Sequence, residues 1–213
     1  MTGALNLLVA LAMGLNLLAL GSSRLPSLIR AAAVQGMVLG VLPLLLEHEF
    51  HGLVWVVAAA TIAIKGFVIP GLLRRALRTA HIDREVEPLL GFIPSLLLGA
   101  MAAIGAVAFA GALPLRPEHA GTLLVPGAFA TLVGGLLLLM GRSKAIAQVC
   151  GYLILENGIY LFGLLLIHAT PLIVEAGILL DLTVGVFVIG IIVDRIQREF
   201  DTLDTRKLTS LRE

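Results

Sequence analysis

The sequence predicts an all-α integral membrane protein, a bundle of about seven transmembrane helices with the N-terminus outside and the C-terminus in the cytoplasm. Of the 213 residues, 59% are hydrophobic and 14% are charged, whereas a soluble domain carries roughly 25% charged residues. The mean hydropathy is +1.03. Several apolar runs reach about twenty residues, the length of a helix that crosses a ~30 Å hydrocarbon core. Together these observations exclude a water-soluble globular domain.

Charged residues divide the chain into seven apolar segments joined by short connections. The first, fourth and fifth segments contain no charged residue. The second contains Arg30, the third Lys65, the sixth Glu156, and the seventh Glu175 and Asp181. The segments span about residues 3–20, 25–46, 52–73, 89–113, 121–140, 145–168 and 171–193.

Lys and Arg residues predict the orientation, because loops on the cytoplasmic side carry an excess of them. Of the fifteen Lys and Arg residues, thirteen fall in or near the first, third and fifth loops and the tail. The opposite side has only Arg116, and Lys65 lies inside a segment. The third loop is expected to hold Arg74, Arg75, Arg78 and Arg84, and the fifth Arg142 and Lys144.

Four ionisable residues lie well inside the apolar segments, where a charge at mid-helix costs about 2.5–3.5 kcal/mol on insertion scales. Glu156 and Asp181 are expected roughly 17 and 18 Å from the cytoplasmic edge, on consecutive antiparallel helices and near the bilayer midplane. Glu175 is expected about 9 Å further out. These residues and Lys65 are the candidate functional residues.

Lys65 is expected roughly 12 Å above the cytoplasmic edge, in the motif KGFVIP. Pro70 cannot donate a hydrogen bond to the carbonyl of Gly66, so a kink with a freed backbone acceptor is expected there. Lys65 could hold a proton, anchor a water chain or pair with a carboxylate. The alternative is that its ammonium reaches the inner interface on its four-carbon stem.

Polar neighbours of the two midplane carboxyls could hold water between them. Asn157 follows Glu156, and Tyr152 and Tyr160 share its helix face because each is four residues away; Thr183 lies near Asp181. Ordinary packing is the alternative for the tyrosines.

Other polar and small residues are interpreted structurally. Asn6, Asn16 and Gln35 are expected to join helices by hydrogen bonds, and Gly36 with Gly40, like Ala106 with Ala110, to let helix backbones approach closely. Glu47, His48, Glu49 and His51 lack the helical HExxH spacing, so no metal site is expected. The lone Cys150 cannot form an internal disulfide. No cofactor is expected to be bound by this chain, and with few aromatic residues no nucleic-acid partner is expected.

The segments SKAIAQVCGYLILENGIYLFGLLLIH, PLIVEAGILLDLTVGVFVIGIIVDRI and KGFVIPGLLRRAL resemble the hydrogenase-4 component E family over most of the chain. That family provides a membrane protein of group 4 NiFe hydrogenases, as in formate hydrogenlyase-type complexes. It is related to the K subunit of complex I and to the C component of Mrp-type antiporters. The resemblance implies an N-terminal four-helix region (1–120), a K-like three-helix core (121–193) and a cytoplasmic tail (194–213).

The resemblance also implies a function. K-type subunits carry two intramembrane glutamates of a proton pathway; Glu156 matches the first, and Asp181, or Glu175 nearby, the second. The expected protein is a multi-pass, non-redox subunit in the cytoplasmic membrane of a bacterium or archaeon. Its partners would be antiporter-like and other membrane subunits and a peripheral hydrogenase or oxidoreductase arm, and the complex would move H⁺ or Na⁺. A structural scaffold and an autonomous transporter are the alternatives, although the inverted repeats typical of a transporter are not visible.

Overall fold

A computed structural model describes residues 2–46, 52–79, 88–114 and 121–165, and all the regular secondary structure in these ranges is helical. Five of the helices are long and apolar enough to cross a membrane: α1, α2, α5, α6 and α7. The protein is therefore a multi-pass, all-helical membrane protein over the described residues. The helices are α1 (Thr2–Leu20), α2 (Leu25–Leu46), α3 (Gly52–Ala63), the π-helix η1 (Ile64–Val68), α4 (Ile69–Thr79), α5 (Phe92–Ala112), α6 (Leu124–Gly141) and α7 (Ala145–Leu165).

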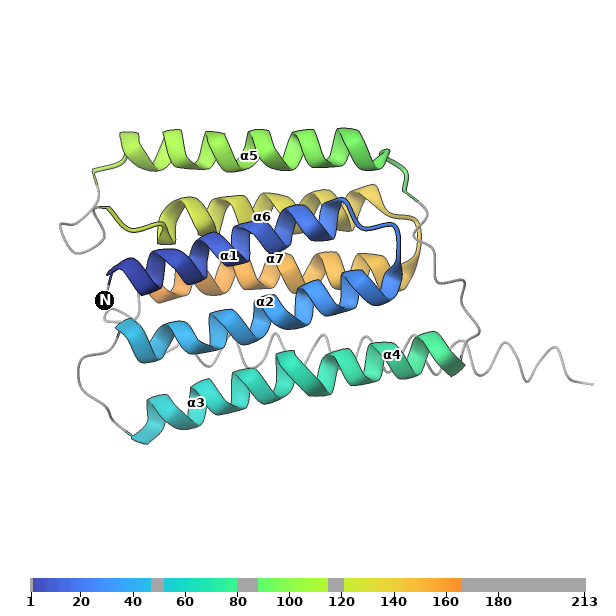
Figure 1. Cartoon of the computed structure of the whole chain (residues 1–213), viewed down its shortest axis with the longest axis horizontal. Coiled ribbons are helices and arrows are strands. Elements are labelled where there is room, and N and C mark those ends of the chain that lie inside the picture. The colour runs from blue at the N-terminus through green and yellow to red at the C-terminus, as the bar shows by residue number, and fades with distance from the viewer. Residues whose placement is uncertain (1, 47–51, 80–87, 115–120, 166–213) are drawn as a thin grey trace, which may run out of the picture.

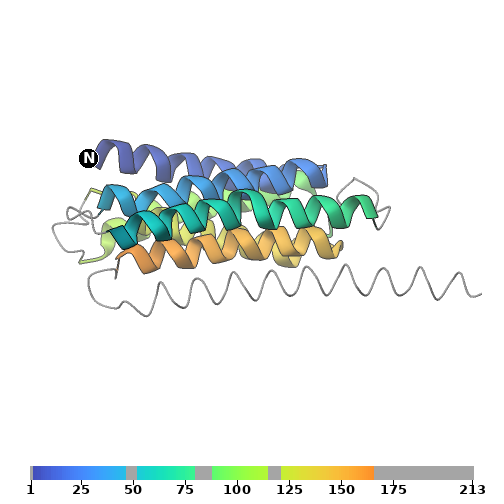
Figure 2. The ribbon, with the colours of Figure 1, turned by 90° about the horizontal axis from the view of Figure 1, so that it is seen from below.

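The helices run along one common axis (Figures 1 and 2). Helices α1, α2, α6 and α7 form the middle of the bundle, with α5 at one edge and the α3–α4 run at the other (Figure 1). The most extensive contact is between α6 and α7, while α2 contacts α1, α3 and α7. The expected segment boundaries agree with these helices to within three residues at most ends, and the segment expected at 171–193 lies outside the described residues.

Glycines set how closely the helices approach. A Cβ atom added to Gly151 or Gly158 of α7 would meet the backbone of α6 at 2.5–2.6 Å, and one added to Gly135 of α6 would overlap the backbone of Leu155. Such contact is possible only without a side chain, and small residues at helix interfaces are typical of membrane bundles. The close approach expected at Gly36 and Gly40 is confirmed, since both face the α3–η1 run.

The third helical run differs from the expectation at its C-terminal end. It was expected to stop near residue 73 and to leave Arg74, Arg75 and Arg78 in a loop, but α4 continues to Thr79. This last part is amphipathic: Leu73, Ala76 and Leu77 are buried while the three arginines are exposed. One helix face buries apolar side chains, so the helix persists beyond the apolar segment.

The same run contains a second feature near Pro70. Residues Ile64–Val68 form one π-helical turn, and the backbone N–H of Ile69 donates to the carbonyl of Ile64. Short π-helical turns accommodate one extra residue within an α-helix. The wider turn therefore precedes the proline and contains the intramembrane lysine.

Candidate functional site: a buried polar layer

Lys65 and Glu156 form an ion pair inside the bundle. The Lys65 Nζ lies 2.6 Å from Glu156 Oε1, and the two side chains are 7% and 2% exposed. Each residue lies within one position of the midpoint of its helical run, 52–79 and 145–165. Two charges meet far from either end of the bundle.

The ammonium group of Lys65 has further electron-rich neighbours. Its Nζ also donates to Asn157 Oδ1 at 3.1 Å and lies 5.6 Å from the centroid of the Tyr160 ring, a cation–π distance. A carboxylate, an amide oxygen and an aromatic face thus surround the Lys65 Nζ. The alternative expectation, that Lys65 reaches the membrane interface, is wrong, because its charge is directed into the bundle.

A line of hydrogen bonds continues from Asn157 across the bundle. Asn157 Nδ2 donates to Gln35 Oε1 at 3.1 Å, and Gln35 Nε2 donates to Asn16 Oδ1 at 2.6 Å. Asn16 Nδ2 in turn donates to Thr131 Oγ1 at 2.9 Å. We call the six side chains the buried polar layer: Asn16, Gln35, Lys65, Thr131, Glu156 and Asn157.

One backbone group fixes the direction of this line. Gln35 Nε2 also donates to the carbonyl of Ala12 at 3.1 Å, and a carbonyl can only accept. The amide nitrogen of Gln35 must therefore face α1 and its oxygen must face Asn157. The Asn157 nitrogen is then used on Gln35, so Asn157 presents its oxygen to Lys65.

The buried polar layer separates two apolar clusters. One cluster, near the α1–α2 turn, includes Leu20, Leu25 and Ile154; the other, toward the opposite end, includes Val9, Leu39 and Leu161. In α2 and α7 the chain passes from one cluster through the polar layer to the other. A charged group in such surroundings is tolerated only when it is paired and hydrogen-bonded, as Lys65 and Glu156 are.

The backbone at Gly36 positions Lys65. A Cβ atom added to Gly36 would lie 2.7 Å from Lys65 Cβ, so the absence of a side chain lets the π-helical turn reach α2. Gly66, the next residue after Lys65, packs against Met37 in the same way. The small residues that were expected to aid packing thus also place the ion pair.

Chemically, the pair can exchange a proton. Transfer from Lys65 Nζ to Glu156 Oε1 would convert two charges into a neutral amine and a neutral carboxylic acid along one hydrogen bond. Desolvation and neighbouring charges decide which form is favoured. A second ionisable group within reach could shift that balance.

The structure brings together several of the residues proposed from sequence but leaves others outside. Lys65, Glu156, Asn157 and Tyr160 meet at one site, while Tyr152 is partly buried and packs against the apolar cluster near the α1–α2 turn. The remaining proposed residues lie outside the described residues, as do the loop and tail positions: Glu47, His48, Glu49, His51, Arg84, Arg116, Glu175, Asp181 and Thr183.

Sequence reasoning missed two features. It assigned Asn16 and Gln35 to helix packing, which is correct, but did not connect them, or Thr131, to Glu156. It also placed Arg142 in the fifth loop, where this residue does lie between α6 and α7, but did not predict that it is 1% exposed. Arg142 Nη2 donates to the carbonyl of Leu20 at 2.5 Å, and its guanidinium lies 5.1 Å from the Phe92 ring. It joins three chain segments at one end of the bundle.

Comparison with known proteins finds similarity over most of the chain to one protein and over part of it to another. The uncharacterized protein Rv0085 of Mycobacterium tuberculosis is 36% identical over 194 residues, which are 89% of this chain and 87% of that protein. Hydrogenase-4 component E of Escherichia coli K12 is 36% identical over 78 residues, which are 37% of this chain and 36% of that protein. The protein of the same name from Shigella flexneri matches to the same extent.

The similarity to the hydrogenase-4 proteins covers less of the chain than the sequence resemblance predicted. The match spans about a third of this chain and about a third of their length, not most of the chain. No family model matches this chain. No solved structure matches it significantly.

Proposed function

The chain belongs to the same protein family as Rv0085 of Mycobacterium tuberculosis, and on this premise we propose that it is a non-redox membrane subunit of an energy-converting hydrogenase or a complex I-like oxidoreductase. In this role it contributes Glu156 and Lys65 to a path for protons, or for Na⁺, through the membrane part of the complex. The partial similarity to hydrogenase-4 component E supports the type of complex.

The observation that carries the proposal is the ion pair between Lys65 Nζ and Glu156 Oε1 at 2.6 Å, at the midpoint of two helical runs. Packing alone does not favour an intramembrane ion pair, because a protein in which apolar residues of similar volume replace such a pair is often as stable or more stable. Ionisable residues within transmembrane helices typically mark ion pathways. The pair is also adjustable, because a proton can move along its short hydrogen bond.

In the proposed mechanism, a proton arriving at Glu156 neutralises the carboxylate and weakens its hold on Lys65. The freed charge of Lys65 then favours the ionised form of the next acidic group, which releases the proton it holds to the following acceptor in the path. The proton on Glu156 moves to the vacated carboxylate, and the original ion pair forms again. Asp181 or Glu175 would be that next group. The hydrogen bond from Lys65 to Asn157 would keep the ammonium in place while Glu156 is neutral.

A scaffold is the second candidate, because the buried polar layer also links α1, α2, η1, α6 and α7 by side-chain hydrogen bonds. In that case the carboxyls pair across helices and anchor neighbouring subunits without conducting ions. The two functions predict different consequences when the charges are neutralised.

The test uses the complete complex, purified through a tag on this chain and reconstituted into vesicles. We expect Glu156→Gln to keep the subunits and the redox turnover but to reduce proton movement at least about tenfold, because a positioned proton-transfer group contributes a factor of about 10²–10⁴. Glutamine retains an oxygen that can accept from Lys65. Proton uptake is followed with a pH-sensitive dye during turnover.

Two further variants complete the design. Ser95→Ala removes a buried hydroxyl that contacts the Leu90 carbonyl outside the buried polar layer, and should leave proton movement unchanged. Glu156→Gln combined with Asp181→Asn should still assemble if the carboxyls conduct, and should lose assembly if they are a scaffold. Unaltered proton movement in Glu156→Gln would remove Glu156 from the mechanism, and copurifying subunits identified by mass spectrometry would test the type of complex.

A further inference from the structure

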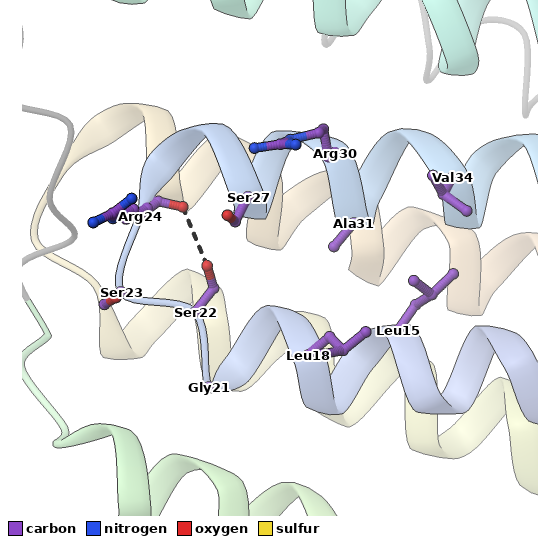
Figure 3. Close-up of a pocket in the computed structure, with 10 residues that line it drawn as sticks. All are labelled: Leu15, Leu18, Gly21, Ser22, Ser23, Arg24, Ser27, Arg30, Ala31 and Val34. Atoms are coloured by element: carbon purple, nitrogen blue, oxygen red, sulfur yellow. Dashed lines mark hydrogen bonds between the residues drawn. The ribbon is translucent and has the colours of Figure 1, made fainter.

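A groove of about 510 Å³ lies between the last two turns of α1 and the first turns of α2, beside the turn that joins them. Its part near the α1–α2 turn is polar, with Arg24, Ser27 and Arg30 (Figure 3). Its part further from the turn is apolar, because Leu15 and Leu18 of α1 face Ala31 and Val34 of α2 across the gap (Figure 3). The groove is thus polar near one end of the bundle and apolar toward the middle.

The two arginines of this groove have no carboxylate among the described residues. Glu156 is the one Asp or Glu in the described part of the chain, and it is buried on Lys65. Arg24 and Arg30 are exposed. Arg30 uses its Nε to donate to the Pro26 carbonyl at 3.3 Å, and both guanidinium groups extend toward the end of the bundle that holds the α1–α2 turn (Figure 3). Two positive charges therefore lie at the polar end of the groove, and no carboxylate of the described residues pairs with them.

The apolar part of the groove continues along the outer face of α1. One face of α2 carries Ser27, Ala31 and Val34. Along this face the groove extends ~10 Å from its polar end toward the middle of the bundle. Leu18 and Leu11 are 66% and 48% exposed, and between them a Cβ on Gly14 would meet nothing within 4 Å. A linear apolar chain could lie against Leu18 and across this notch.

We propose that this groove binds one anionic phospholipid. The phosphodiester would be held by the guanidinium groups of Arg24 and Arg30 with the Ser27 hydroxyl, since guanidinium binds phosphate oxygens in a bidentate manner. One acyl chain would lie against Leu18 and Val34. Basic pockets between transmembrane helices are suited to lipid head groups, and the apolar half distinguishes this site from one for a soluble anion. The proposal is independent of the function proposed above.

The test uses the full-length protein in nanodiscs that contain equal amounts of phosphatidylglycerol and phosphatidylcholine. After transfer to detergent, bound lipid is counted by native mass spectrometry. We expect one phosphatidylglycerol per protein, and we expect Arg24→Gln with Arg30→Gln to lower its binding about tenfold or more, at about 1 kcal/mol per cation near a charged lipid. The matched control is Arg74→Gln with Arg75→Gln, because these α4 arginines are also exposed.

The other arms decide the identity of the ligand. Val34→Asn should weaken lipid retention without removing a charge, and inorganic phosphate at millimolar concentration should not displace the lipid. An equal loss of bound phosphatidylglycerol in the Arg74 and Arg75 control would show that general surface charge, and not this groove, retains the lipid. Displacement by phosphate, or retention of phosphatidylcholine equal to that of phosphatidylglycerol, would overturn the proposal.

Discussion

Gln35 connects the central ion pair to the first helix of the bundle. Its amide donates to Ala12 and Asn16 and accepts from Asn157, so three of its hydrogen-bonding positions are filled within the bundle. Because the side chain is 1% exposed, lost partners there are not replaced freely by water. The orientation of Asn157, and with it the acceptor offered to Lys65, depends on this one residue.

Replacing Gln35 by leucine should therefore destabilise the protein more than its small change in volume suggests. Gln35→Leu leaves Asn157 Nδ2 without its acceptor and Asn16 Oδ1 without its donor. Each buried polar group left unsatisfied costs about 1–3 kcal/mol. The free energy of unfolding in mixed detergent micelles measures the loss.

The matched control is Gln148→Leu, because Gln148 is half-buried and makes one hydrogen bond, to the Arg142 carbonyl at 3.0 Å. It should lose about 1 kcal/mol or less. Equal losses in the two variants would show that the line through Gln35 does not determine the stability of the layer.

Individual functional residues could be predicted from the sequence where their charge alone marks them. Lys65 and Glu156 were identified because a charge within an apolar segment is costly, and the structure places them in contact. The partners of Gln35 could not be found in this way, because neutral amides are common in membrane helices and their contacts depend on which helices are neighbours. The burial of Arg142 was missed for a related reason, since its carbonyl partner belongs to another helix.

The α6–α7 pair is the element that holds Glu156 in place. Gly135 of α6 faces the backbone of Leu155, the residue immediately before Glu156. The two helices can approach because α6 presents no side chain at this point. Any increase in their separation would move the Glu156 carboxyl relative to Lys65, which is held on a different helical run.

We expect Gly135→Ala to destabilise the protein by about 1–3 kcal/mol, the usual cost of overpacking a close interface. The added methyl would overlap backbone atoms of Leu155, which cannot rotate away. Gly105→Ala is the control, because nothing lies within 4 Å of its added Cβ on α5; it should be neutral or slightly stabilising, since alanine is preferred in helices. Thermal unfolding in detergent compares the two, and a Gly135→Ala variant as stable as Gly105→Ala would contradict this account of the interface.

Element boundaries were predictable wherever an apolar segment ends at a charge. The end of the third run was not, because Arg74, Arg75 and Arg78 lie on the exposed face of an amphipathic helix. Proline signalled a disturbance near Lys65 but did not indicate its form. The missing N–H of Pro70 is compatible with either a kink or a π-helical turn, and the packing of Gly66 on Met37 accompanies the latter.

The whole molecule is polarised by charge. The α1–α2 turn, the C-terminal end of α4 and the α6–α7 turn lie at the same end of the bundle (Figure 1). The described Lys and Arg residues other than Lys65 belong to these places: Arg24, Arg30, Arg74, Arg75, Arg78, Arg142 and Lys144. Cationic ends of membrane helices are retained in the cytoplasm, so we predict that this end is cytoplasmic and that Thr2 lies outside.

Cysteine labelling tests the orientation directly. The native Cys150 is fully buried on α7 and should not react with a membrane-impermeant maleimide, so it provides a silent background. Ser23→Cys, at the exposed α1–α2 turn, should be labelled in inverted vesicles and not in intact spheroplasts. Thr2→Cys, exposed at the start of α1, should show the opposite pattern. Labelling of Ser23→Cys from the outside would reverse the bundle and place the groove with Arg24 and Arg30 in the outer leaflet.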